Sequence, residues 1–411
     1  MESERAMVVV GAGEAGAAAV TALREGGWAG PLILIGSEDS LPYERPPLSK
    51  AFLVEEPPPG PRHILTSDRL RELRVTTLFG RSALSIDRSR HRVKISDGAN
   101  VPYERLLLAT GAAPRTLPPR YGSAQNVFTL RTHDDAVRLR GAIVPRSKIV
   151  VIGGGFIGLE VAASAVSRGA SCVVLEAGPR LLTRAVPEVL ACLIQGRHER
   201  AGVQIVTSAS ITRIEERAEQ TLIILEDARV FCADMVVVGI GAVPNVKLAE
   251  AAGLSVDNGI VVDETLATSD PNIFAAGDCC SFPHPLYERR LRLEAWRNAR
   301  RQAITAAANM LGAHQIHDDI PWFWSDQYEE TLQIAGICPD QPAVHRDLGP
   351  KGTVLFYLDH DSKLVAACGF GSLGVIAKEI RFSETLIARR LKLSPAALAD
   401  PAMNLKSLLV S

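Results

Sequence analysis

Residues 7–16 read MVVVGAGEAG, and residues 149–158 read IVVIGGGFIG. Each stretch is a β-branched run that ends in a G-x-G-x-x-G turn, and each opens an alanine-rich segment with helical patterning. In such a turn the first glycine permits the tight bend, the second lets a pyrophosphate approach the backbone, and the third lets the helix pack on the strand. The phosphates then lie at the helix N-terminus. One turn predicts one bound dinucleotide. Two turns predict two dinucleotides and electron transfer between them.

The segments that follow each turn support this interpretation. A second apolar strand ends near an acid about 20 residues after each turn, where a ribose-binding carboxylate is needed. These acids are Glu38, which follows Ser37, and Glu176. Each unit closes with a similar segment, LLLATGAAP at residues 106–114 and VVVGIGAVP at residues 236–244. The chain therefore carries an internal duplication of a nucleotide-binding unit, which disfavours the alternative that either turn is only a tight strand–helix connection.

Length and charge limit the class of protein. The 411 residues allow two or three domains with a large buried core. The net charge is −1 with acids and bases interspersed, so we expect no nucleic-acid partner. The apolar N-terminal segment, residues 7–23, carries Glu14 and three glycines, so we expect neither a targeting nor a membrane role for it.

The cysteines are sparse. The seven cysteines are mostly isolated in the sequence, so we expect neither a disulfide framework nor a C-x-x-C metal site. The adjacent pair Cys279-Cys280 is too local to cross-link distant segments. We expect Cys172, Cys192 and Cys232 to be small hydrophobes on core strands or helices. The default is therefore a reducing, cytoplasmic setting with no bound metal.

The order of these motifs predicts the fold class. We expect an α/β chain with two Rossmann-like dinucleotide-binding domains and a small α+β C-terminal domain. The first domain is discontinuous, and the predicted boundaries are residues 1–115 and 243–320 for the first domain, 116–242 for the second and 321–411 for the last.

Several local elements are predicted as well. The proline-rich residues 42–61 are expected to form an extended surface segment. A long helix is expected from about Leu293 to Leu311. In the last domain the apolar patterning predicts strands at Leu332–Gly336, Gly352–Leu358 and Leu364–Phe370, followed by helices.

Taken together, these residues resemble the FAD-dependent pyridine-nucleotide oxidoreductases with a glutathione-reductase-like fold. More narrowly, they resemble the NADH-dependent ferredoxin reductases that serve Rieske oxygenases and bacterial cytochromes P450. The most specific piece is LPYERPPLSK at residues 41–50. Further matching pieces cover nearly the whole chain: residues 109–111, 153–160, 275–278, 294–296 and 322–327.

The resemblance implies that the first domain binds FAD, the second binds NADH and the last covers the flavin. Disulfide reductases of this superfold carry a redox cysteine pair, but the matching stretch, residues 45–50, contains no cysteine. Dithiol chemistry is therefore not expected. The implied FAD-binding residues are Gly11, Gly13, Ala15, Gly16, Ser37, Glu38, Arg45, Lys50, Ala83, Ala109, Thr110, Gly111, Arg131, Gly277, Asp278, Trp296 and Trp324. The implied NADH-binding residues are Gly153, Gly155, Ile157, Gly158, Glu160, Glu176, Arg184 and Gly241.

The implied catalytic residues are Lys50 and Glu160. Taken from the sequence alone, Lys50 would be a solvated lysine, Glu160 a first-turn helix acid favoured by the helix dipole, and Trp296 and Trp324 core tryptophans. The resemblance instead pairs Lys50 with Glu160 beside the flavin. A cation there would favour the reduced, anionic flavin, and its partner acid would limit the cost of burying it.

Three acids, Glu14, Glu38 and Glu176, lie in or just after the predicted dinucleotide-binding motifs. Members of the family usually carry an acid where this chain has Ser37, so that role falls to Glu38 or to the serine hydroxyl. Glu14 lies inside the first phosphate turn and is expected to point away from the pyrophosphate. Glu176 would repel a 2′-phosphate and so predicts NADH over NADPH. Arg180 and Arg184 lie just beyond it and could bind a phosphate of the nucleotide.

The implied reaction is hydride transfer from NADH to FAD, followed by single-electron transfer to a 2Fe-2S ferredoxin. Spacings of three and four put Arg297, Arg300 and Arg301 on one helical face, with Arg289, Arg290 and Arg292 just before it. This face is either a ferredoxin-docking patch or a solvated surface. Two alternatives for the whole protein stay open: a rubredoxin or small-oxidant reductase, and a non-enzymatic NADH-sensing flavoprotein related to the apoptosis-inducing factor. We expect a monomer or a weak dimer.

Overall fold

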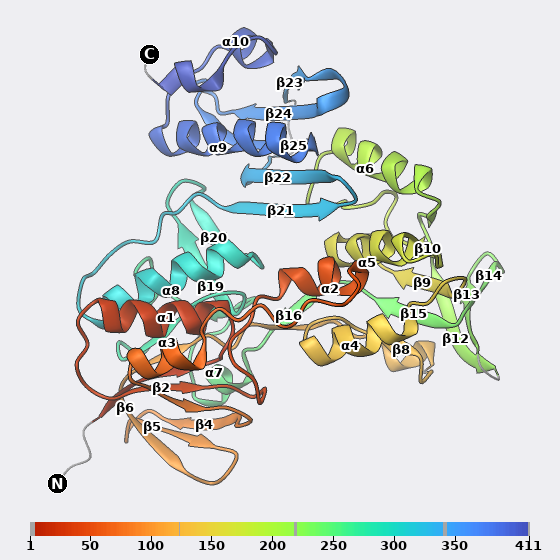
Figure 1. The fold of residues 1–411 in the computed structure, drawn as a ribbon. Helices are drawn as coiled ribbons and strands as arrows, with labels where there is room; N and C mark the ends of the chain where they lie inside the picture. Colours follow the sequence, from red (N-terminus) through yellow and green to blue (C-terminus); the bar gives the residue numbers. More distant parts are fainter. Residues whose placement is uncertain (1–4, 123, 218–219, 340–342, 410–411) are drawn as a thin grey trace. The chain divides into compact units, whose positions relative to one another are not determined.

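Strand β1 (Ala6–Val10) is buried along its whole length and begins the first sheet of the computed structural model (Figure 1). It pairs in parallel with β2 (Leu32–Ile35) and with β6 (Asn100–Leu108). The sheet continues in parallel with β3 (Val75–Leu78) beside β2 and β18 (Ile273–Ala275) beside β6. Strands of a parallel sheet are covered on both faces, which is why these segments read as nearly continuous apolar runs.

The structure describes residues 5–122, 124–217, 220–339 and 343–409. The chain divides into two compact units. The first unit comprises residues 1–44, 61–113 and 243–319, and the second comprises residues 45–60, 114–242 and 320–411. The division into three domains, with their boundaries, stays a prediction.

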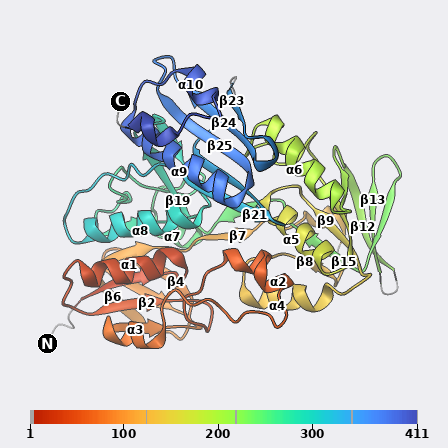
Figure 2. The ribbon, with the colours of Figure 1, turned by 45° about the horizontal axis from the view of Figure 1, so that its top comes forward.

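In the first unit, helices α1 (Glu14–Glu25) and α8 (Trp296–Met310) pack side by side (Figure 2). Alanines cover the buried faces of both helices, so the two backbones approach closely. Helix α8 begins at Trp296 rather than near Leu293, because Ala295 has extended backbone angles. The remaining elements of this unit are α3 (Ser67–Glu72), α7 (Lys247–Ala251), β4 (Ala83–Asp87), β5 (Arg92–Ile95), β17 (Ile260–Val261), β19 (Cys280–His284) and β20 (Arg289–Leu291).

The second unit begins with a second parallel sheet, in the strand order β11-β10-β9-β15-β8. Helix α5 (Phe156–Ser167) follows its central strand and packs on β9 and β10. The strands are β8 (Val127–Phe128), β9 (Lys148–Ile152), β10 (Ser171–Leu175), β11 (Gln204–Val206) and β15 (Met235–Val238). The other elements are α4 (His133–Ala142), α6 (Glu188–Arg200) and the antiparallel strands β12 (Ile211–Arg217), β13 (Gln220–Leu225) and β14 (Val230–Ala233).

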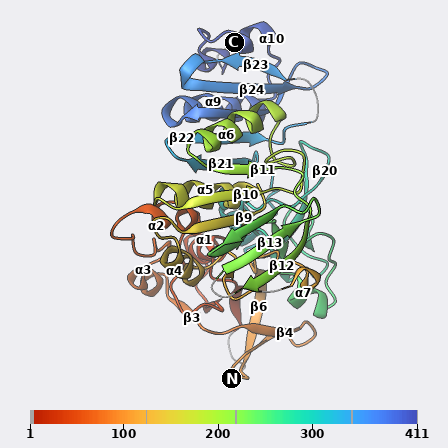
Figure 3. The same cartoon turned by 90° about the vertical axis from the view of Figure 1, so that its right-hand side faces the viewer.

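The last part of the second unit is a five-stranded antiparallel sheet in the order β21-β22-β25-β24-β23, covered by α9 (Leu373–Arg389) (Figure 3). Its strands are β21 (Trp322–Gln327), β22 (Glu330–Gly336), β23 (Val344–Asp347), β24 (Gly352–Leu358) and β25 (Leu364–Ser372). The three predicted strands are present as β22, β24 and β25, whereas β21 and β23 were not predicted. One sheet with a parallel core and antiparallel strands β5 and β4 at one edge, one fully parallel sheet and this α+β part confirm the predicted fold class.

The expectation of an extended surface segment at residues 42–61 is wrong for its central part. Residues Pro46–Ser49 form a 3₁₀ turn, η1, and Ala51–Val54 form the short helix α2. Phe52 and Leu53 are buried, because α2 packs against α4 and α5. Two arginines bind the carbonyls at its C-terminal end: Arg140 donates to Phe52 O and Glu55 O at 2.7 Å each, and Arg168 donates to Leu53 O at 3.0 Å. Lys50 therefore lies between η1 and the anchored helix α2.

Candidate functional site

The first glycine-rich turn is shaped by close backbone contacts. Gly11 has a φ of +116°, and a Cβ there would lie 2.0 Å from Ala109 O. A Cβ on Gly16 would lie 1.8 Å from Gly11 O. At Gly13, by contrast, a Cβ would have no neighbour within 4 Å among the described residues. Helix α1 begins directly afterwards, and no described side chain caps its N-terminus. The turn therefore offers free N–H groups beside open space, which fits a pyrophosphate.

The other predicted FAD-binding residues of the first unit gather along one edge of the sheet. Because β1, β6 and β18 are adjacent and parallel, the segments that follow them lie together: residues 11–16, 109–111 and 277–278. Gly277 N–H donates to the fully buried Gln302 of α8 at 2.8 Å. The carboxyl edge of a parallel sheet is where α/β proteins bind nucleotides.

The end of β2 carries the predicted ribose-binding residues. Ser37 is exposed, and the Glu38 carboxylate accepts a hydrogen bond from the Tyr43 hydroxyl at 2.5 Å. Arg81 N–H donates to Gly36 O at 2.9 Å, which brings the chain before Ala83 to the same edge. Glu38 is therefore oriented by a neighbour, whereas Ser37 faces solvent.

Glu14, inside the first turn, pairs with Arg300 of α8. Its Oε1 lies 3.2 Å from Arg300 Nη1, and its side chain is only 9% exposed. Burial raises the pKa of Glu14, and the hydrogen bond and charge of Arg300 act in the opposite direction. The pair turns the carboxylate towards α8, and it also occupies one arginine of the predicted docking face.

The second glycine-rich turn repeats the construction of the first. Gly153 has a φ of +108°, and a Cβ there would lie 2.5 Å from Gly239 O. A Cβ on Gly158 would lie 2.2 Å from Gly153 O. A Cβ on Gly155 would meet its nearest neighbour, Gly239 O, only at 3.7 Å. This turn lies at the carboxyl end of β9, beside the equivalent end of β15, where Gly241 and the chain after it follow.

Glu176, at the end of β10, is held against this turn. Its two carboxylate oxygens accept backbone N–H groups, from Gly154 and from Gly178, at 2.6 Å each. Each oxygen keeps a further lone pair that can accept a ribose hydroxyl. The two backbone bonds fix the orientation of the carboxylate, which suits a group that recognises a ribose.

The two arginines beyond Glu176 behave differently. Arg180 donates to three carbonyls of its own loop, those of Leu181, Thr183 and Val186, at 3.0–3.3 Å. It therefore stabilises the loop. Arg184 is exposed, and its Nη2 lies 3.9 Å from the position of a Cβ on Gly241.

The structure brings Lys50 and Glu160 together within the second unit. Lys50 Nζ lies 2.7 Å from Glu160 Oε2, and the two side chains are 22% and 3% exposed. Two hydroxyls also donate to this carboxylate, Ser49 to Oε2 at 2.5 Å and Ser325 to Oε1 at 2.6 Å. A buried carboxylate is tolerated only with such a complete set of partners. Neither serine is among the predicted site residues, although Ser49 directly precedes Lys50.

Strand β21 presents two different faces, as the alternation of a strand requires. On one face Trp322 and Trp324 stack with ring centroids 5.2 Å apart, and Trp324 Nε1 donates to Asp326 at 3.1 Å. On the other face the Phe323 ring lies 4.3 Å from that of Phe156, and Ser325 reaches Glu160. Trp324 and Glu160 therefore lie on opposite sides of β21.

Two more predicted FAD-binding residues meet in the second unit. Arg45, just before η1, donates to the backbone carbonyl of Arg131 at 2.6 Å. The next residue, Thr132, caps α4 through a reciprocal pair of bonds with Asp135. The Arg45 side chain thus fixes the start of residues 45–54, which we call the Lys50 segment, to the start of α4.

Acidic partners reduce the net positive charge of the arginine face of α8. Arg300 and Arg301 are 48% and 51% exposed, but Arg300 pairs with Glu14 and Arg301 Nε lies 3.7 Å from Asp319. Before the helix, Arg292 pairs with Glu294 at 2.6 Å, and Arg290 donates to the carbonyl of Val262 at 2.5 Å. Arg297 lies on the same helix face as Arg300 and Arg301.

The seven cysteines are free thiols. Cys172 is buried, and this burial raises its pKa to about 12. The expectation that Cys192 and Cys232 are core residues is wrong, because both are exposed. Within the described ranges, no group of three or more His, Cys, Asp or Glu could hold a metal ion. A membrane-spanning helix is likewise absent from the part of the chain that the structure describes.

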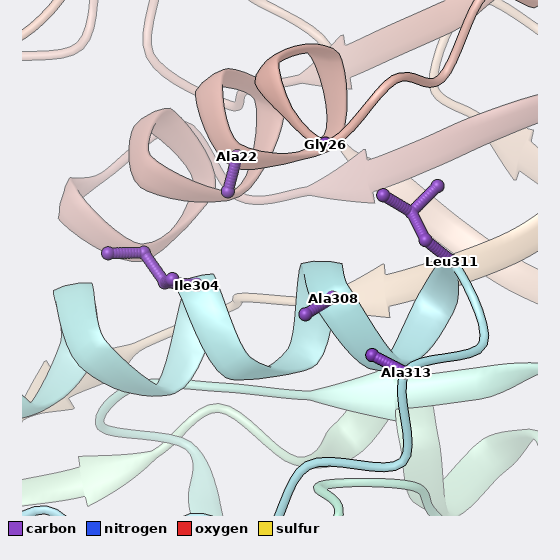
Figure 4. Close-up of a pocket in the computed structure, with 6 residues that line it drawn as sticks. All are labelled: Ala22, Gly26, Ile304, Ala308, Leu311 and Ala313. Atoms are coloured by element: carbon purple, nitrogen blue, oxygen red, sulfur yellow. The ribbon is translucent and has the colours of Figure 1, made fainter.

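A pocket of about 250 Å³ lies between α1 and α8 in the first unit (Figure 4). It is near the C-terminal end of α1, about 9–15 Å along the helix from Gly16. It is too small for a dinucleotide, and it is separate from the predicted site residues. Its lining is small and apolar, from Ala22, Gly26, Ile304, Ala308, Leu311 and Ala313.

Known proteins match the chain from end to end. Residues 5–303 match the family model described as pyridine nucleotide-disulphide oxidoreductase, and residues 322–409 match the one described as reductase C-terminal. Putidaredoxin reductase of Pseudomonas putida is 36% identical, covering 100% of this chain and 98% of that protein. The ferredoxin–NAD(+) reductase component of the anthranilate 1,2-dioxygenase system of Burkholderia cepacia is 38% identical, covering 98% of each. The solved covalent complex of putidaredoxin reductase with putidaredoxin matches with a TM-score of 0.91 at 36% identity, covering 99% of this chain and 98% of that one.

Proposed function

The chain belongs to the pyridine nucleotide-disulphide oxidoreductase family, and on this premise we propose that it is an FAD-containing enzyme that transfers electrons from NADH to a 2Fe-2S ferredoxin. The observation that carries the proposal is the pair of open glycine-rich turns, in a chain that named ferredoxin reductases match over its whole length. Two such turns provide for two dinucleotides. The absence of cysteine from residues 45–50 argues against the dithiol chemistry of other members of the family.

FAD is assigned to the turn of the first unit. The free N–H groups at the start of α1 would bind its pyrophosphate, and the open space at Gly13 leaves room for it. Glu38, oriented by Tyr43, would bind the ribose, and Asp278 the ribityl chain. Bound flavin supplies hydride acceptance and single-electron release. Lys50 would stabilise the negative charge of the reduced state, and Glu160 with its two serine donors would hold that lysine in place.

NADH is assigned to the turn of the second unit, with Glu176 as the ribose-binding acid. Because both oxygens of Glu176 are tied to backbone N–H groups, the acid cannot swing away from a 2′-phosphate. Arg180 is committed to its own loop and offers no compensating charge. Both points support a preference for NADH over NADPH.

The ferredoxin is assigned to the arginine face of α8. The docking contribution is shared by Arg297, Arg300 and Arg301, although Arg300 also pairs with Glu14 and Arg301 with Asp319. Small ferredoxins are acidic, and attraction between opposite charges speeds their encounter with a basic face and weakens with salt.

The test uses the purified holoenzyme. We expect a flavin absorption band with one FAD per chain, released by acid precipitation, and bleaching of the band by anaerobic NADH. Reduction of a 2Fe-2S ferredoxin should then be fast and should slow as ionic strength rises. Fast reduction of rubredoxin or of oxygen but not of ferredoxin would replace this proposal by the rubredoxin or small-oxidant alternative. Reduction by NADH without turnover of any acceptor would favour the sensing role.

A further inference from the structure

A line of hydrogen bonds continues from Glu160 into a region that the proposed chemistry does not use. Ser325, which donates to Glu160, lies 3.1 Å from the side-chain nitrogen of Gln327. Gln327 Oε1 lies 2.8 Å from His198 Nε2, and His198 Nδ1 lies 3.0 Å from the Tyr328 hydroxyl. All of these residues belong to the second unit. The line joins the Lys50 segment, α5, β21 and α6.

The charge of Glu160 dictates the sense of every bond in this line. A carboxylate only accepts, so the Ser325 hydroxyl must donate to it, and its oxygen is left to accept from the Gln327 amide. The Gln327 carbonyl oxygen then faces His198 and needs a donor, so His198 must carry its proton on Nε2. The Nδ1 lone pair in turn accepts from the Tyr328 hydroxyl. One anion thus fixes one amide orientation and one histidine tautomer.

Burial makes the line rigid. Glu160, Ser325, Gln327 and His198 are 0–4% exposed, so water does not replace a lost partner. Burial, with a smaller contribution from the Arg197 charge, lowers the pKa of His198 to about 4. The neutral imidazole that the bonding pattern requires is therefore its stable form. At the outer end the Arg197 guanidinium lies 3.9 Å above the Tyr328 ring and pairs with Glu329 at 2.8 Å, which holds that end in place.

We propose that Ser325, Gln327 and His198 are positioning residues that aim hydrogen bonds at Glu160 and, through it, fix Lys50 for its action on the flavin. The Gln327 amide is a poor proton carrier, so the line orients groups and does not conduct protons. This inference rests on the proposed function of the Lys50–Glu160 pair. It assigns a role to a histidine on α6 that touches neither predicted dinucleotide turn.

The functional test measures the rate at which NADH reduces the flavin in single-turnover stopped flow. We expect Ser325→Ala, Gln327→Met and His198→Phe each to slow this step roughly fivefold, the scale of one coupled interaction. His198→Gln should retain the rate within about twofold, because a glutamine amide can donate from near the position of Nε2. In a Lys50→Met background the same substitutions should have little further effect, since they act through that lysine. Equal slowing in both backgrounds, or no slowing in the wild type, would overturn the proposal.

A matched control separates this effect from the general cost of altering a buried histidine. His317 is 1% exposed, belongs to the first unit and has a pKa that burial lowers to about 4. His317→Phe should leave the rate of flavin reduction unchanged. If it slows the step as much as His198→Phe does, the effect is one of stability and the positioning role is wrong.

A second readout needs no bound flavin. In ¹⁵N-histidine NMR of the apoprotein, His198, assigned by its loss in His198→Gln, should show the neutral tautomer with the proton on Nε2. Glu160→Gln and Ser325→Ala, which are remote from the ring, should shift this signal. A proton on Nδ1, or a signal that ignores both substitutions, would overturn the inference. If these spectra behave as expected but NADH does not reduce the holoenzyme, the proposed function fails and the positioning line stands.

Discussion

The two glycine-rich turns have the same backbone but different side chains around it. We call the β1–α1–β2 segment the first half of the internal duplication and the β9–α5–β10 segment the second half. In the first half the residue directly after β2 is Gly36, whose N–H donates to Leu78 O at 3.0 Å. The second half has Glu176 in the equivalent place, and its N–H donates to Val206 O at 2.8 Å. The predicted ribose-binding acid therefore follows the strand directly in the second half, whereas in the first half Ser37 or Glu38 would have to take that role. Two turns with the same backbone can therefore be accompanied by different predicted ribose-binding residues.

The helices after the two turns differ more strongly. Two residues after the third glycine, α1 has Ala18 and α5 has Glu160. The alanine is buried in the first unit, whereas the glutamate and the nearby Ser164 face the Lys50 segment, where Ser164 donates to Ser49 O at 2.8 Å. The first helix is thus built for dense packing and the second for polar positioning. The duplication supplies two equivalent backbones, and single side chains make one of them the place of the ion pair.

The largest expected effect comes from replacing the third glycine of each turn by alanine. In Gly16→Ala the new Cβ would clash with Gly11 O, so we expect loss of bound FAD and a decrease of about 3 kcal/mol in the free energy of unfolding. Gly158→Ala should keep FAD and weaken NADH binding. Gly13→Ala, which faces open space among the described residues, should leave the unfolding of the apoprotein unchanged. FAD content and urea unfolding measure this, and loss of the same cofactor from both turn variants would show that the halves are not specialised.

The next effect concerns the ion pair of the second half. We expect Lys50→Met to slow flavin reduction by NADH roughly 10- to 100-fold and to lower the flavin potential, because the positive charge is lost. The control is Lys148→Met, an exposed lysine at the start of β9. Stopped-flow reduction and potentiometry measure both quantities. An unchanged rate together with an unchanged potential would leave the pair with a structural role only.

A smaller effect is expected at the acid that distinguishes the halves. Glu176→Ala should narrow the preference for NADH over NADPH by about 1–3 kcal/mol, the scale of one charged hydrogen bond. The ratio of kcat/KM for the two nucleotides measures it. Glu188→Ala, an exposed acid at the start of α6, is the control and should keep the wild-type ratio. Equal kcat/KM values in the wild type would contradict the assignment of Glu176.

The smallest effect concerns α8, a helix of the first unit that packs against α1. Arg297→Glu with Arg301→Glu should raise the KM for ferredoxin severalfold at low salt and leave NADH-to-ferricyanide turnover near the wild-type rate. Arg300 is spared because a glutamate there would face Glu14. Arg213→Glu, an exposed arginine on β12 of the second unit, is the control. A parallel fall in both activities, or a ferredoxin rate that ignores salt, would place docking elsewhere.

Local patterns made much of the fold predictable. A G-x-G-x-x-G turn is a property of a few consecutive residues, because the positive φ of its first glycine and the close contacts of its first and third glycines exclude a Cβ. Apolar runs of four or five residues likewise predicted β1, β2, β9 and β10, because each run lies within one continuous stretch of sequence. The short helix at residues 51–54 escaped prediction, since its stability comes from burying Phe52 and Leu53 and from two distant arginines, not from local propensity.

The sequence by itself determined the two nucleotide-binding units, their order and the residues of both turns, since each is encoded within one continuous stretch. The tertiary structure alone decided what surrounds Glu160: Ser49 lies 111 residues away in sequence and Ser325 lies 165 residues away. It also decided that Glu14 pairs with Arg300, 286 residues away, and that Arg180 serves its own loop. A hydrogen bond requires only that two groups meet in space, so partners from distant segments leave no periodicity or spacing in the sequence. Those contacts set the electrostatics of the site, and only the folded chain brings them together.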